Sequence, residues 1–202
     1  YLMFSLYLLV FFIMNAGYRG FAFQYLWPDS PRWENLSTIQ FIFLYQAVAI
    51  LFAMVFLEVK RQLPLMHYVL SRWLGVLALI WLADTLIGRS SIYYCAAAVY
   101  TCLISLPLAV IAGVHAWKKG YRTARFFVLG SIAGLLSVTL TALTVLGLVS
   151  YDFFSLHVGE VGILIDTVLF SLALVDHINI LNLKHKDAER DRKSVVEGKG
   201  VD

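Results

Sequence analysis

Ionisable side chains occur inside the most apolar part of this chain, and they are its strongest candidates for chemistry. The stretch 159–181 reads GEVGILIDTVLFSLALVDHINIL and contains Glu160, Asp166 and Asp176, with His177 directly after. Its 23 residues are enough to cross a bilayer. Because a charge inside a bilayer is costly, we treat all of these residues as candidate functional groups.

Asp166 is the deepest of these groups in the stretch. A carboxyl group there could take up protons or bind a cation, and it could equally accept a hydrogen bond from a neighbouring helix. We favour the hydrogen bond, because polar residues commonly hold membrane bundles together. Glu160 lies at one end of the stretch, where it can reach water. Asp176 and His177 lie at the other, where they can pair with a basic loop or with headgroups.

The polar residues of this stretch fall on two sides of a helix. At about 100° per residue, Asp166 shares one face with His177, and Glu160 shares another with Thr167 and Ser171. Two polar faces predict a helix that is surrounded by other helices rather than by lipid.

No catalytic or metal-binding pattern accompanies these residues. The sequence has no HExxH or CxxC pair, no Walker or dinucleotide fingerprint and no Gly-x-Ser-x-Gly. Cys95 and Cys102 lie about 10 Å apart along one expected helix, so they cannot form a disulfide with each other there. The stretch 159–181 has no lysine for a retinal Schiff base. We therefore expect no enzymatic activity, no metal and no cofactor in this chain.

The elements that must position these groups are membrane-spanning helices. The chain has 202 residues, of which 60% are hydrophobic and 14% charged, whereas soluble domains have about 45–50% and about 25%. We expect an all-α polytopic bundle with six spanning segments, at residues 1–16, 38–57, 73–87, 92–116, 126–149 and 159–181. Asp84 lies near the outer end of the third segment and is expected to reach water.

The connections between these segments differ in charge. Loops 58–72 and 117–125 and the tail residues 182–190 hold ten lysines and arginines, against three in the alternate connections. By the positive-inside rule, the basic loops and the C-terminus are cytoplasmic. We expect a multi-pass protein of the plasma membrane, with the lipid bilayer as a partner and no nucleic acid.

Connection 17–37 is the longest on the outer side. Tyr25, Trp27 and Trp33 suit the headgroup level, where aromatic residues form a belt. We favour this anchoring role, and contact with an unknown extracytoplasmic ligand is the alternative.

Local signals refine the expected helices. Asn35 or Ser37 could cap the second segment. Pro107 predicts a kink in the fourth. Gly130 and Gly134 form a GxxxG pattern that permits close helix approach, although such patterns are common in membrane helices.

The last segment continues without a break into a polar, basic sequence. A 4-3-4-3 spacing typical of a coiled-coil seam is formed by Leu174, Ile178, Leu181, His185 and Ala188. This predicts a helix that leaves the membrane as a dimerising stalk, with an ordinary polar helix end as the alternative. The domain division is then 1–183 for the transmembrane sensor and 184–190 for the start of a cytoplasmic signalling helix.

Three motifs in order resemble a known family. They are GFAFQYLWPDSP at 20–31, AWKKGYRTARFF at 116–127 and TVLFSLALVDHI at 167–178. Together they resemble the membrane domain of bacterial seven-transmembrane receptors with diverse intracellular signalling modules. The resemblance implies a receptor of two-component or related signalling. Its output module would be a histidine kinase, a diguanylate cyclase or a phosphatase that lies outside this chain.

The chain departs from that family at three places. It opens on YLMFSLYLLVFFIM without a charged leader, so we expect a fragment that lacks the family's first helix. Where members commonly have Ala-Asp-Arg, it has Val175-Asp176-His177. Residues 191–202 resemble a reading frame of a sequencing adapter and are expected to be a non-native tail.

We predict a receptor domain that passes a stimulus through its last helix to a cytoplasmic module. The alternative is a small-solute or ion transporter or channel, which predicts inverted repeats and broken helices. No convincing repeat is visible in the sequence.

Overall fold

The computed structural model describes most of the chain. The described residues are 2–87, 92–121, 123–145, 147, 149–150, 152, 157–159, 161–162, 164–176, 178–179, 182 and 186. Within these ranges the elements are helices joined by short connections, and no strand occurs. The prediction of an all-α helical bundle is confirmed.

The helices follow in chain order as α1 to α7. Their bounds are α1 Leu2–Tyr18, α2 Phe21–Tyr25, α3 Pro31–Phe56, α4 Val59–Gln62, α5 Pro64–Ile87, α6 Ile92–Lys118 and α7 Ala124–Val145. A further helical stretch, here called the last helix, includes the span His157–Asp176. Among the described residues, five helices are long and apolar enough to cross a membrane, and α1 is a shorter apolar helix.

The third spanning helix is longer than the sequence prediction. We expected residues 73–87, but α5 begins at Pro64 and has 24 residues. Proline suits the first helical position, because its φ angle is already helical and its missing N–H would have no partner there. Arg72 therefore lies within α5 rather than in a loop, and its guanidinium carbon lies 4.6 Å from the ring centroid of Tyr68.

The connection before α3 is also shorter than predicted. Neither Asn35 nor Ser37 caps the helix, because α3 already begins at Pro31 with Ser30 at the N-cap position. The short helix α2 takes up part of the same connection. α6 continues as helix through Pro107.

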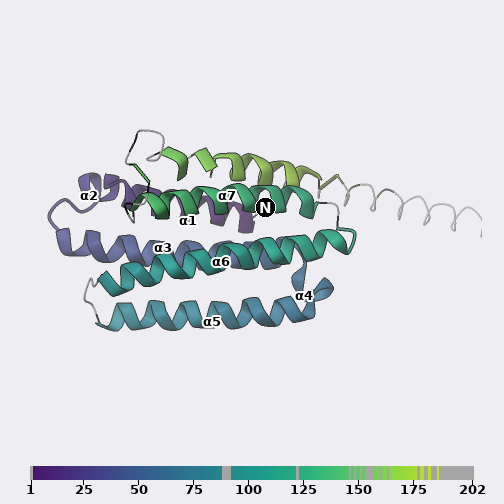
Figure 1. Cartoon of the computed structure of the whole chain (residues 1–202), viewed down its shortest axis with the longest axis horizontal. Helices are drawn as coiled ribbons and strands as arrows, with labels where there is room; N and C mark the ends of the chain where they lie inside the picture. Colours follow the sequence, from purple (N-terminus) through teal and green to yellow (C-terminus); the bar gives the residue numbers. More distant parts are fainter. Residues whose placement is uncertain are drawn as a thin grey trace, which may run out of the picture.

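α3 is the central element of the bundle. It packs against α1 on one side and against α5 and α6 on the other, while α6 also packs against α7. Figure 1 shows α2 at one end of the bundle and α4, with the turn between α6 and α7, at the opposite end. We call these the α2 end and the α4 end.

Aromatic rings fill the space between α1, α3, α7 and the last helix. Phe127 and Phe170 stack at 5.1 Å with an interplanar angle of 5°. Phe52 lies within 5.5 Å of the rings of Tyr7, Phe56 and Phe170. Buried rings contribute much of the packing energy of a core, and here they surround the polar groups described next.

Candidate functional site: a polar network at mid-depth

Asp166 lies at the centre of the last helix and of the bundle. It is the tenth residue of the 20-residue span His157–Asp176, and only 6% of its surface is exposed. Its Oδ2 accepts a hydrogen bond of 2.8 Å from the hydroxyl of Tyr7 on α1. The structure thus places the carboxyl group where the sequence pattern favoured it, in a contact with a neighbouring helix.

Tyr7 extends this contact to a third helix. Its hydroxyl oxygen lies 3.1 Å from the hydroxyl of Tyr45 on α3. Since the single hydroxyl proton of Tyr7 is donated to Asp166, Tyr45 must donate to Tyr7. Two hydrogen bonds therefore run in sequence from α3 through α1 to the last helix.

One oxygen of Asp166 has no hydrogen-bond partner among the described residues. Its Oδ1 is buried and lies against α7, where a Cβ built at Gly130 would be 2.6 Å from it. The same Cβ would be 3.0 Å from the ring of Phe170. Gly130 thus makes room for the carboxyl group, whereas Gly134 has open space around it and makes no close contact.

A second glycine brings α7 and the last helix together. A Cβ at Gly162 would collide with the side chain of Ser137. One turn away, a Cβ at Gly159 would lie 3.4 Å from the hydroxyl of Thr141. Small residues at such positions let two membrane helices approach closely.

The opposite face of the last helix is uncovered in the described structure. Large apolar side chains project there at 43–65% exposure, namely Val161, Leu164, Ile165, Val168, Leu172 and Val175. Ser171 is also exposed. The prediction that other helices surround the last helix is wrong for this chain, because only the face of Asp166, Phe170 and Ala173 is buried.

A second polar network lies on the other side of α3. Gln46 donates to the Ala98 carbonyl at 3.2 Å. Its Oε1 shares the Ser105 hydroxyl proton with the Thr101 carbonyl, at 3.1 and 2.7 Å. The Trp73 indole donates to the same Ser105 oxygen at 2.9 Å. These contacts join α3, α5 and α6, also near the middle of their spans.

Asp84 does not reach water, which corrects the sequence prediction. It is fully buried at 0% exposure, and its Oδ2 accepts a 2.6 Å hydrogen bond from Gln40 of α3. Thr85 donates to the other end of the Gln40 amide at 3.2 Å. The helix ends at Ile87, as predicted. The error arises because packing places this last turn against Gln40 of α3, and the sequence does not show which helices become neighbours.

At the α4 end, Asp176 lies half-buried with Oδ2 lacking a hydrogen-bond partner among the described residues. Tyr121, in the turn between α6 and α7, donates to the Phe56 carbonyl at 3.3 Å. Burial, together with the negative charges of Glu58 and Asp176, raises the pKa of Tyr121 to about 12. The phenol therefore remains a neutral donor at physiological pH.

At the α2 end, the aromatic side chains are accessible. Tyr25 is 74% exposed and Trp33 is 52% exposed. The rings of Trp27 and Trp33 meet edge to face at 6.4 Å. Such a pair can anchor the end of the bundle at the headgroup level, and its exposure leaves the ligand-contacting role open.

Several predicted features lie outside the described residues. These are Glu160 and His177, most of the proposed stalk at 184–190, and the tail at 191–202. Within the described residues, no group of three or more His, Cys, Asp or Glu side chains is arranged to hold a metal ion.

A family model described as 7TM diverse intracellular signalling matches residues 1–177. The chain belongs to this family. It is accordingly a multi-pass membrane domain of a signalling receptor, as the three motifs indicated. No curated protein and no solved structure matches the chain.

Sequence reasoning missed most partners in this receptor domain. Tyr7, Tyr45 and Gln46 are polar residues within apolar helices, and that was the available signal. It could not pair them, because the bonded residues are 38 to 159 positions apart in the chain. Their pairing depends on which helices become neighbours.

Proposed function

We propose that this receptor domain conveys a stimulus from outside the membrane, or from within the bilayer, through its last helix to a cytoplasmic output module. That module would be a histidine kinase, a diguanylate cyclase or a phosphatase. The observation that carries the proposal is the hydrogen bond from Tyr7 to Asp166.

This bond makes the last helix sensitive to movements elsewhere in the bundle. A displacement of α1 or α3 at the α2 end changes the distance between the Tyr7 hydroxyl and the Asp166 carboxyl group. Because a hydrogen bond acts only over a short distance, the displacement decides whether the bond is kept or lost. A switch requires two helix packings of similar free energy, and the stimulus would shift the population from one packing to the other. The uncovered opposite face allows the last helix to shift without displacing another described helix.

The proposed direction of signalling depends on orientation. Lys60, Arg61 and Lys118 lie at the α4 end, which supports a cytoplasmic position for that end in the bacterial inner membrane. A membrane-impermeant maleimide added to intact cells should label Tyr25→Cys and should leave Lys118→Cys unlabelled. The reverse labelling pattern would overturn the orientation and the signalling direction with it.

The complete receptor allows a direct test of helical transmission. One residue inserted after Leu183 rotates all that follows by about 100°, and a seven-residue insertion nearly restores the phase. Output should therefore change sharply with insertion length and largely return at seven residues. Membrane level, measured for every variant, serves as the control.

Output that ignores all of these insertions would identify the link as a flexible tether. The last helix would then be an anchor.

A further inference from the structure

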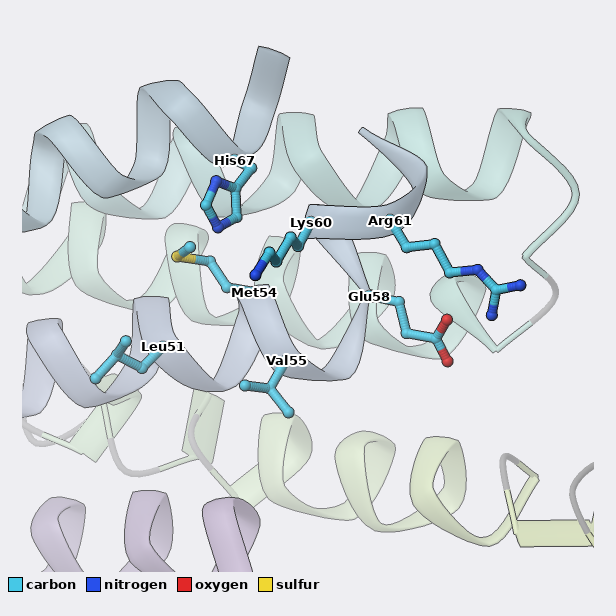
Figure 2. A pocket seen from close by; sticks show the side chains of 7 residues that line it. All are labelled: Leu51, Met54, Val55, Glu58, Lys60, Arg61 and His67. Carbon is cyan, nitrogen blue, oxygen red and sulfur yellow. The ribbon is translucent and has the colours of Figure 1, made fainter. Parts of the chain in front are cut away.

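A pocket of about 370 Å³ lies at the α4 end of the receptor domain, separate from the networks around Asp166 and Gln46. It is bounded by the end of α3, by α4 and by the first turn of α5 (Figure 2). Its position at the end of the span Leu36–Phe56 places it at the boundary between acyl chains and headgroups.

The floor of the pocket is apolar. It is formed by Leu51, Met54 and Val55, which lie on α3. Leu51 is 41% exposed and Val55 is 56% exposed. Because both lie within the membrane span, their open surface faces acyl chains rather than water.

The upper side of the pocket is basic. Figure 2 shows the Lys60 amine above Met54 and the His67 ring beside it, arriving from α4 and α5. Arg61 also lines the pocket, although its guanidinium points away from this pair (Figure 2). Glu58 is the acidic residue of the lining, so the lining residues carry two permanent positive charges and one negative charge.

The backbone holds these side chains in place. Glu58 has a φ angle of +46°, a left-handed conformation that reverses the chain directly after α3. Val59 and Leu63 are then buried at 0% and 6% exposure, while Lys60 and Arg61 remain exposed. The short helix α4 is thus fixed by its apolar side and presents its basic side over the groove.

We propose that this pocket binds the headgroup of an anionic phospholipid, with one acyl chain lying along Leu51 and Val55. The phosphate diester would accept hydrogen bonds from Lys60, whose ammonium group offers three donors. Hydrogen bonds between a charged donor and a charged acceptor are stronger than those between neutral groups. Basic pockets between membrane helices are suited to anionic headgroups, and this one adds an apolar groove that a free phosphate would not fill. The proposal does not rest on the signalling role.

The test uses the purified chain in phosphatidylcholine nanodiscs that contain a photoactivatable phosphatidylglycerol. Peptide mass spectrometry should locate cross-links on the segment that contains Leu51 and Val55. Lys60→Gln should bind the probe about fivefold more weakly, since each basic residue near a membrane surface adds about that factor. Lys118→Gln is the matched control, because Lys118 is an exposed basic residue at the same end but outside the pocket.

Two further arms separate the sources of the signal. Val55→Trp should lower labelling without altering the charge, because the indole would fill the groove. Soluble glycerol phosphate should not compete with the lipid probe.

Three results would overturn the proposal. Equal losses in Lys60→Gln and Lys118→Gln would indicate a general charge effect. Equal labelling by a photoactivatable phosphatidylcholine would indicate ordinary boundary lipid. Competition by glycerol phosphate would indicate a site for a soluble phosphate ester.

Discussion

Among its described residues, the receptor domain buries two aspartates, and they differ in what they join. Asp84 lies in the last turn of α5 and meets the amide of Gln40 on one neighbouring helix. Asp166 lies at the middle of its span and is linked through two phenols to α1 and α3. Each keeps one buried oxygen without a hydrogen-bond partner among the described residues.

The comparison shows that burial alone does not indicate a role. A long amide such as Gln40 has several rotatable bonds and can follow a small movement of Asp84. Tyr7 and Tyr45 are rigid rings inside an aromatic cluster, so they cannot follow Asp166 in the same way. We therefore expect Asp84 to hold two helices together and Asp166 to report on the arrangement of three.

The largest expected difference is in signalling. In the complete receptor, Asp166→Leu should change basal output or response by at least about fivefold, the lower end of typical coupling free energies. Asp84→Leu, the matched control, should change it by less than about twofold. Output measured at equal membrane level checks both. Equal effects of the two substitutions, or unchanged output in Asp166→Leu, would remove the distinction between them.

The next difference concerns the packing around Asp166. Gly130→Ala should destabilise the chain by about 1–3 kcal/mol, because the new methyl group would overpack against the carboxyl group and the Phe170 ring. Gly134→Ala meets open space and should be neutral or slightly stabilising. Thermal unfolding in detergent compares the two. A stable Gly130→Ala would mean that α7 and the last helix separate easily.

The smallest effect should come from the hydrogen bond itself. Tyr7→Phe removes the donor to Asp166 and should cost about 0.6 kcal/mol, the average for hydrogen bonds between membrane helices. A double-mutant cycle with Asp166→Leu, which removes the acceptor, should give a coupling energy of that size. A cycle between Tyr7→Phe and Asp84→Asn should give none, because these residues share no contact that links them. Additivity in the first cycle would exclude a direct bond.

The sequence was informative about element type and about Asp166, and less so about boundaries and partners. Apolar runs marked each spanning helix, but hydropathy shows where a segment becomes polar and not where its helix begins. That is why the predicted start of the third segment was residue 73, whereas α5 begins at Pro64. Asp84 was misplaced for another reason, because its burial depends on the contact with Gln40 of α3. Helix neighbours are set by packing among all segments, so the link between Tyr7 and Asp166 could not be read from spacing.

Tyr45 and Gln46 are consecutive on α3, and they belong to different networks. The side chains of neighbouring residues point about 100° apart around the helix axis, so a rotation of α3 moves Tyr45 and Gln46 together. A rotation of α3 by about 20° about its axis would move the ends of both side chains, about 6 Å from the axis, by about 2 Å, in directions that strain both sets of bonds. Hydrogen bonds weaken steeply over such a displacement. The two hydrogen-bond networks therefore both oppose rotation of α3 about its axis. This favours an all-or-none change in the position of α3 over a graded one.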